Sequence, residues 1–256
     1  MEKVAKNGLR AAQERMLELL EIFDDICKEE GLVYWLDHGT LLGAVRESGF
    51  IPWDDDLDVT MPREDYERFL EIAPRQLPET IFLQTKESDP ATPVHYAKLR
   101  DRRSTYIDKW EKGKKICYHQ GIFIDIFPLN RIDPAREKTY AKLLNFAKLF
   151  SNRYVKIDTV AKYLIGKINA FHDPAGELVV SGAETMHYVV HIPQSIVFPL
   201  GSVPFESREY PAPGDPARYL ASIFGKDFMT PPPPEKRISH SAEIHEDIPC
   251  KKETDG

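Results

Sequence analysis

Four aspartates stand close together in this chain, Asp54, Asp55, Asp56 and Asp58, directly after the apolar run GFIPW. Like charges this close repel one another, so the folded protein must compensate them. A divalent cation, Mg²⁺ or Mn²⁺, is the first candidate, because both ions prefer carboxylate oxygens. Carboxylates that hold such a metal serve phosphoryl or nucleotidyl transfer, in which the metal neutralises charge on phosphate oxygens.

Two simpler interpretations compete with a metal site. A solvated acidic loop is the usual fate of a charge run, but such a loop has no need of the apolar Leu57 and Val59 that interleave with the acids. On a strand, the alternation points Asp56 and Asp58 to one side. A calcium loop of the EF-hand type is excluded, because counting from Asp54 places Val59 at the sixth position, where that loop needs glycine.

The elements that must position these acids alternate between helix and strand. Apolar residues at three- and four-residue spacings predict a helix over 9–30, and Pro62 opens another over 62–74. Runs of β-forming residues predict strands at 32–37, 56–61, 81–85, 94–100 and 121–129. The last strand is apolar except for Asp125, which is typical of a buried strand. Asp125 is therefore either the third carboxylate of the site or a core acid that is protonated or paired with arginine.

A glycine turn precedes the acidic cluster. The segment GTLLGAVRE predicts a turn that opens a short helix, with Thr40 as its cap. Gly39 allows close approach of the backbone, and the free amides at the start of a helix can hold a phosphate. This turn, followed by a strand of alternating aspartates and hydrophobes, is the pattern of a nucleotidyltransferase-type fold.

Basic side chains near the turn are candidates for contacts with a substrate. Arg46 can bind a phosphate through two N–H groups or pair with a neighbouring acid, and both interpretations stay open. Lys98 is favoured over Arg102 and Arg103 for a donor phosphate, because charges at a sheet edge are usually solvated. His38 is either structural or an acid–base group, and Trp53 either packs the loop or stacks on a base or a choline cation. Arg237 and His240 follow the prolines and are expected to close over the site.

The length and composition allow one large domain with insertions or two small domains. The chain has 256 residues, of which 42% are apolar, and its net charge of −7 makes nucleic acid a poor partner. No apolar run is long enough to cross a membrane and no signal-peptide core is seen, so we expect a cytoplasmic setting. The cysteines, Cys27, Cys117 and Cys250, form no CxxC pair and predict reduced thiols.

The second half of the chain predicts a helical insertion over 131–171. Within 131–170, nine Lys or Arg stand against three Asp or Glu. This basic region is either a solvated face or, over 135–170, a peripheral contact with the inner face of a membrane or with a lipid-linked acceptor. We expect a single catalytic domain over 1–240, followed by a mobile tail over 241–256.

The stretch WLDHGTLLGAVRESGFIPWDDDLDVTMPREDYERFL closely resembles the LicD family, phosphotransferases related to phosphocholine transferases of bacterial surface glycans and to the fukutin group in animals. Later stretches are similar to this family in the expected order: YAKLRDRRST, GIFIDIFPL and YPAPGDPARYLASIFGKDFMTPPP. The resemblance covers roughly residues 20–240. It implies an α/β (α+β) fold of the nucleotidyltransferase type, with a mixed sheet flanked by helices.

The resemblance also implies an activity. It is the metal-dependent transfer of a phospho-alcohol from a CDP-alcohol, with CDP-choline favoured, to a sugar hydroxyl of a lipopolysaccharide, teichoic acid or related glycan. Carried over by motif, the catalytic and metal-binding carboxylates are Asp56, Asp58 and Asp125, the last as ligand or general base. Asp54 and Asp55 would orient the loop. The residues expected to bind the donor are Gly39, Thr40, Arg46 and Lys98.

Three other functions stay open. A nucleotidyltransferase would move the nucleotide half of its donor and release pyrophosphate. A DxD-type glycosyltransferase also uses paired aspartates and a metal, but the turn at Gly39 would then have no role. A non-catalytic scaffold with the same fold has no need of Asp56, Asp58 and Asp125 together.

Overall fold

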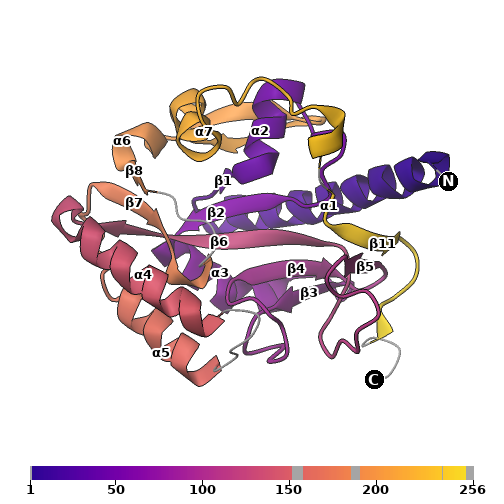
Figure 1. Cartoon of the computed structure of the whole chain (residues 1–256), viewed down its shortest axis with the longest axis horizontal. Helices are drawn as coiled ribbons and strands as arrows, with labels where there is room; N and C mark the ends of the chain where they lie inside the picture. The colour runs from indigo at the N-terminus through magenta and orange to yellow at the C-terminus, as the bar shows by residue number, and fades with distance from the viewer. Residues whose placement is uncertain (1, 152–157, 186–190, 238, 252–256) are drawn as a thin grey trace.

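A mixed sheet forms the centre of the computed structural model, which describes residues 2–151, 158–185, 191–237 and 239–251 (Figure 1). Within these residues the sheet has seven strands: β1 (Trp35–Leu36), β2 (Asp58–Pro62), β3 (Ile81–Gln84), β4 (Ala97–Asp101), β6 (Phe123–Ile132), β7 (Leu178–Ser181) and β8 (His191–Pro193). The order is β1-β2-β6-β4-β3, and β7 pairs with β6 and β8. Only β2 and β6 run parallel among the described pairs. The expected mixed α/β fold is confirmed.

Helices pack against the sheet. They are α1 (Glu2–Glu30), α2 (His38–Glu47), α3 (Arg63–Gln76), α4 (Glu137–Ser151), α5 (Asp158–Asn169), α6 (Gln194–Val197) and α7 (Pro216–Phe224). In Figure 1, α1 runs behind the sheet, whereas α2 and α7 lie together above β1. Short 3₁₀ turns occur at Pro134–Arg136, Ala183–Thr185 and Pro234–Lys236. No described helix is long and apolar enough to cross a membrane.

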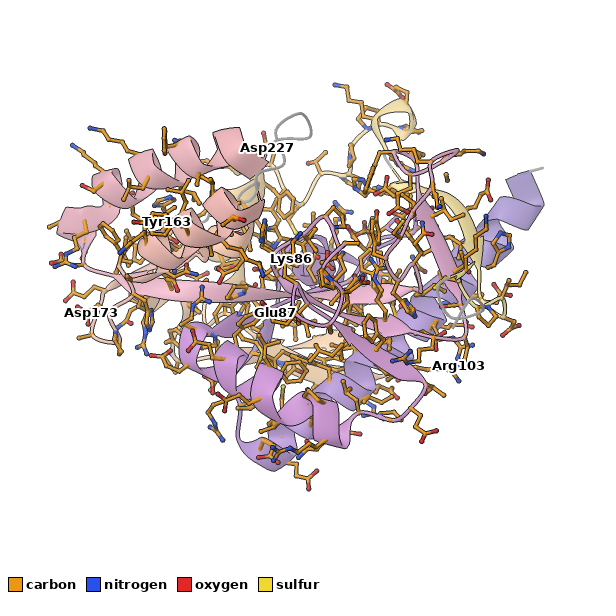
Figure 2. All side chains as sticks on the ribbon, turned by 90° about the horizontal axis from the view of Figure 1, so that it is seen from below. Lys86, Glu87, Arg103, Tyr163, Asp173 and Asp227 are labelled. Atoms are coloured by element: carbon orange, nitrogen blue, oxygen red, sulfur yellow. The ribbon has the colours of Figure 1, made fainter. Side chains whose placement is uncertain are left out.

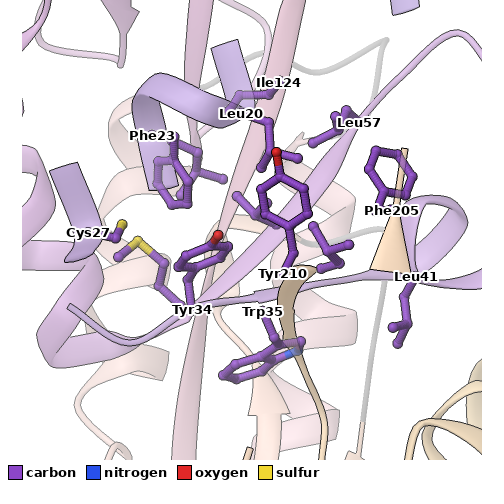
Figure 3. Close-up of a cluster of buried hydrophobic side chains, with 14 of the residues drawn as sticks. Leu20, Phe23, Cys27, Tyr34, Trp35, Leu41, Leu57, Ile124, Phe205 and Tyr210 are labelled. Carbon is purple, nitrogen blue, oxygen red and sulfur yellow. The ribbon is translucent and has the colours of Figure 1, made fainter. Parts of the chain in front are cut away.

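The main core lies between α1, α3 and the sheet. The apolar face of α1 places Leu20 and Phe23 against it, and Ile124 of β6 contributes from the centre of the sheet (Figure 3). The Phe23 ring packs edge-on against Tyr34, at 4.9 Å, and against Phe69, at 5.0 Å. Aromatic pairs of this geometry stabilise a core beyond the area they bury. This packing joins α1 to α3 and to Tyr34, just before β1.

The helical pair α4–α5 lies between β6 and β7 in the chain, where the helical insertion is expected. It has a small core of its own, in which Tyr140 and Ile165 pack against Val180 of β7. Tyr163 lies on this pair at one side of the molecule, and Arg103 lies at the other (Figure 2). Arg63 of α3 donates two hydrogen bonds, of 2.8 and 2.9 Å, to Glu184 in the 3₁₀ turn after β7, and Asn169 Nδ2 of α5 donates to the same carboxylate at 2.7 Å. The limits of a single domain over 1–240 stay a prediction.

The C-terminal segment differs from the expected mobile tail. Ser241–His245 forms β11, which pairs with β5 (Thr105–Asp108), and Cys250 is buried. Thr105 Oγ1 also donates to Ile248 O at 2.7 Å. The prediction of a tail from 241 is therefore wrong for 241–250. A short polar strand has little periodic signal, and only its distant partner reveals it. A second hairpin, β9 (Gly201–Phe205) and β10 (Arg208–Ala212), packs beside α2.

Candidate active site

Six carboxylates line one cavity of about 380 Å³, and four of them lie where β2 begins and on the neighbouring strand β6: Asp54, Asp56, Asp58 and Asp125. Asp58 is the first residue of β2, and Asp125 is its partner in the parallel β2–β6 ladder. Adjacent strands lie about 4.8 Å apart, so these two side chains are neighbours. Asp56 precedes the strand rather than lying in it, which differs from the predicted strand over 56–61. The structure thus brings the three predicted catalytic carboxylates to one cavity.

Asp55 has a different environment from its neighbours, and it is not among the residues that line the cavity. Its carboxylate accepts hydrogen bonds from Ser239 Oγ at 2.7 Å, His240 N at 2.9 Å and Ser241 N at 2.6 Å. Burial by itself would raise the pKa of Asp55, but these donors lower it below the usual value. Asp55 therefore anchors the C-terminal segment, and that segment brings His240 into the cavity lining.

Gly39 lies directly against the carboxylate of Asp54. A Cβ atom at Gly39 would lie 2.7 Å from Asp54 Oδ2, closer than van der Waals contact permits. His38, the first residue of α2, has φ of 43°, a left-handed conformation that is uncommon outside glycine. Both residues line the cavity, so the amino end of α2 opens into it. A helix start favours a bound phosphate through its free amides and its dipole.

Thr40 does not cap α2, which corrects the sequence prediction. The N-cap is Asp37, whose carboxylate accepts from His38 N at 2.7 Å. Thr40 is buried, and its Oγ1 instead accepts from Asp58 N at 2.8 Å. The hydroxyl therefore holds the start of β2 against α2, and Thr40 is outside the cavity lining. Its contact with a donor phosphate stays a prediction.

Asp54, Asp56 and Asp58 have raised pKa values, because they are largely buried and close to one another and to Asp125. Burial, then the charge of Asp56 and a hydrogen bond to it, raise the pKa of Asp54 to about 9. Burial, then repulsion from Asp56 and Asp125, raise the pKa of Asp58 well above its usual value. Burial also raises the pKa of Asp56, and Asp125 adds to the effect. Neighbouring carboxylates that cannot all ionise together mark a site that a cation would stabilise.

Lys98 of β4 supplies one positive charge by forming an ion pair with Asp125. Tyr96 Oη donates to the other oxygen of Asp125 at 3.3 Å. Burial lowers the pKa of Lys98, although the charge of Asp125 opposes this effect. Lys98 lines the cavity as predicted, but its partner here is Asp125. Whether Lys98 also contacts a donor phosphate stays a prediction.

The donor set fits a divalent cation in its chemistry, since carboxylate oxygens are the ligands that Mg²⁺ and Mn²⁺ prefer. The raised pKa values of Asp54 and Asp58 come from burial and from neighbouring carboxylates, so a cation bound there would stabilise their charged forms. The side chains are not gathered into a formed site, because no group of three Asp, Glu, His or Cys in the described part of the chain could hold an ion as it stands. The assignment of Asp56, Asp58 and Asp125 as ligands stays a prediction.

Arg46 and Trp53 lie together outside the cavity lining. Arg46 Nε is 2.9 Å from Glu47 Oε1, and its guanidinium lies 5.8 Å from the centre of the Trp53 ring. Arg237 lies over the same ring at 4.2 Å. Arg46 thus has a neighbouring acid as its partner, which is one of its two interpretations. Donor binding by Arg46 stays a prediction.

The aromatic residues of the cavity were not predicted from the sequence. Those lining it are Tyr96, Tyr106, Trp110, Tyr118, Phe123, Phe127 and Phe224. Phe123 and Phe127 could have been found, because they alternate with Asp125 on one face of a strand. Trp110 and Tyr118 lie in the irregular segment after β5, where no periodic pattern points to a site.

Comparison with known proteins agrees with this geometry. Residues 31–154 match the family described as LicD/FKTN/FKRP, nucleotidyltransferase domain. The lipopolysaccharide cholinephosphotransferase LicD of Haemophilus influenzae is 32% identical over 176 residues, which cover 65% of this chain and 64% of that protein. Residues 31–154 therefore form a LicD-family domain. The resemblance inferred from the acidic motif is therefore confirmed.

The LicD domain contains Asp54, Asp56, Asp58 and Asp125 of the cavity, together with Gly39 and Lys98. Shorter matches to the chain include the ribitol-5-phosphate transferase FKTN of Mus musculus, 37% identical over 54 residues, which cover 21% of this chain and 12% of that protein. Mannosyltransferase regulator 4 of Saccharomyces cerevisiae is 36% identical over 56 residues, or 22% of this chain and 5% of that protein. The chain thus matches less than two thirds of the length of each of these relatives.

Proposed function

We propose that the protein transfers a phospho-alcohol group, phosphocholine above all, from a CDP-alcohol donor to a sugar hydroxyl of a cell-surface glycan. The observation that carries the proposal is the cavity in which Asp54, Asp56, Asp58 and Asp125 meet the amino end of α2 inside the LicD domain. The similarity to a protein named as a lipopolysaccharide cholinephosphotransferase supports it.

Each part of the cavity has a chemical task in such a transfer. The start of α2 at Gly39 would hold the donor phosphates through backbone amides. Asp125 would accept the proton of the attacking hydroxyl, and Lys98 keeps its carboxylate oriented. Bound Mg²⁺ or Mn²⁺, held by Asp56 and Asp58, would neutralise charge on the diphosphate. Lipid-linked acceptors at the inner face of a membrane would be reached through the basic region 135–170.

The test is a product assay with CDP-choline, Mg²⁺ and lipopolysaccharide as the acceptor. We expect CMP release and phosphocholine on the glycan, both lost when the metal is chelated. Asp58→Asn should lower turnover about 100-fold or more, because metal ligation is worth several kcal/mol in the transition state. Asp173→Asn changes an exposed acid outside the cavity lining and should retain full turnover.

The alternatives give different products. Release of pyrophosphate from CTP would identify a nucleotidyltransferase, and sugar transfer from a UDP-sugar would identify a glycosyltransferase. The short match to a protein named as a regulator favours a scaffold as the second candidate. That role would be supported if the protein binds its partners but wild type and Asp58→Asn turn over none of these donors.

A further inference from the structure

One end of the cavity plays no part in the phosphate chemistry proposed above. Three aromatic rings and two carboxylates from one segment of the chain line it: Tyr106, Asp108, Trp110, Glu111 and Tyr118. A local turn builds this end, because Asp108 Oδ1 accepts from Trp110 N at 3.1 Å and Asp108 O accepts from Glu111 N at 2.9 Å. The five residues are therefore held as a unit beside the catalytic carboxylates.

Strand geometry separates this end from a second aromatic group. Side chains two residues apart share one face of a strand and lie about 7 Å apart, so Phe123, Asp125 and Phe127 form a row on β6. Phe127 packs against Tyr96, with ring centres 4.7 Å apart. Phe123 packs against Tyr106, with ring centres 5.0 Å apart. A donor whose phosphates lie at Asp125 therefore has one aromatic group on each side.

Charge distinguishes the two groups. Asp108 and Glu111 lie on the Phe123 side, whereas Pro93 and Val94, which precede Tyr96, carry no charge. Arg100 also lies near Phe123, but its Nε donates to Gln84 Oε1 at 2.6 Å and its Nη1 to Gly121 O at 2.7 Å. Burial, together with the charges of nearby aspartates, raises the pKa of Tyr106. Lys98 Nζ also lies 3.7 Å from the centre of the Phe123 ring, but its ion pair is with Asp125. Lys114 Nζ lies 5.1 Å from the centre of the Trp110 ring, so a cation already lies over that ring. The Phe123 side therefore combines aromatic rings with the carboxylates Asp108 and Glu111.

Glu111 determines which kind of cation suits this end. Its Oε1 accepts from Tyr118 Oη, and its Oε2 accepts from Gln120 Nε2 at 2.8 Å and from Asp108 N at 3.0 Å. A primary ammonium ion needs acceptors for three N–H bonds. A quaternary ammonium ion has no N–H bond and needs only negative charge and ring faces. A carboxylate that is already hydrogen-bonded supplies charge without requiring a donor.

We propose that Tyr106, Trp110 and Tyr118, with the charge of Glu111, bind the quaternary ammonium head of a choline-like donor, and that the nucleoside lies at the Tyr96–Phe127 end. This inference rests on the proposed function, since it assigns the two ends of a CDP-alcohol. It gives the site a preference for choline over neutral polyols and over ethanolamine.

Calorimetric titration with Mg²⁺ present tests the preference. Wild type should bind CDP-choline about tenfold more tightly than CDP-ethanolamine or CDP-glycerol, as cation–π contacts predict. Trp110→Ala should lose that preference and Trp110→Phe should keep most of it, because phenylalanine retains a ring. Glu111→Gln should weaken binding of CDP-choline but not of CDP-glycerol. Unchanged CDP-glycerol affinity in each variant also shows that it is folded, and Tyr163→Ala on α5 is the control for loss of a distant ring.

The outcomes separate this inference from the proposed function. If CDP-glycerol is bound and transferred with no preference for CDP-choline, the inference is overturned and the transferase stands. If phosphocholine binds in a manner that depends on Trp110 but no donor is turned over, the inference is supported and the transferase is overturned. A choline preference that survives in Trp110→Ala and Glu111→Gln would also overturn the inference.

Discussion

Asp55→Asn tests whether the second acid of the cluster anchors the C-terminal segment. The Asp55 carboxylate accepts three hydrogen bonds, from Ser239 Oγ, His240 N and Ser241 N. An asparagine has one acceptor oxygen, so its amide group would face at least one of these donors. Hydrogen bonds to a charged group contribute about 1.5–3 kcal/mol each, so losing one strong bond or two weak ones costs about 3 kcal/mol and predicts docking of β11 weakened by about 2–4 kcal/mol.

The same contact has a predictable pH dependence. Hydrogen-bond donors lower the pKa of Asp55 below its usual value, although burial opposes them. A carboxyl group with a depressed pKa in the folded state stabilises the fold above its unfolded pKa, about 3.9, and loses that effect as pH falls below it. The wild-type segment should therefore loosen only in acid, whereas Asp55→Asn should loosen it at neutral pH.

Hydrogen exchange of the Ser241–His245 amides measures this docking directly. A weakening of about 2–4 kcal/mol predicts exchange about 30- to 1,000-fold faster in Asp55→Asn, with β2 amides affected less. Asp54→Asn is the matched control, because the substitution is the same one residue away and Asp54 faces the cavity. Unchanged protection of β11 in Asp55→Asn, or equal loss in both variants, would refute the assigned role of Asp55.

Two further substitutions test the raised pKa of Asp54 and the buried ion pair between Arg63 and Glu184. Because the pKa of Asp54 is raised to about 9, the folded state holds a proton that the unfolded chain releases. Metal-free wild type should therefore lose thermal stability as pH rises from about 4 to 9, and Asp54→Asn should flatten this slope; an unchanged slope would count against the raised pKa. Arg63→Ala breaks a buried pair with Glu184 and should lower the free energy of unfolding by about 3–5 kcal/mol in urea. Glu67→Ala, an exposed partner at 4.0 Å, should change it by less than about 0.5 kcal/mol, and equal effects would contradict the burial argument.

Much of the fold followed from patterns that are local in the chain. Apolar spacing predicted α1, and the near-continuous apolar run predicted β6 with Asp125 on it. The acidic motif and the glycine turn together predicted a site that Asp58 and Asp125 share, and β2 and β6 are indeed neighbours. These predictions succeeded because helix and strand periods, and the burial of apolar side chains, depend on residues a few positions apart.

Local patterns failed where two groups competed for one role. Asp37 and Thr40 are both good helix caps by type, and the structure uses Asp37. Thr40 instead accepts from Asp58 N, a contact between α2 and β2 that sequence spacing does not reveal. The tail was misjudged for a similar reason, because β11 is recognisable only through its pairing with β5.

By itself, the sequence determined that an acidic site exists, which strand carries its third carboxylate and which family the chain resembles. Only the tertiary structure decided how the adjacent acids differ. Asp54 and Asp55 have identical side chains, yet Asp54 lines the cavity and has a raised pKa. Asp55 has a lowered pKa and accepts a hydrogen bond from Ser239, which lies 184 residues further along the chain. The physical reason is that periodicity acts along the chain, whereas the field and hydrogen bonds at a carboxylate come from whatever the fold places beside it.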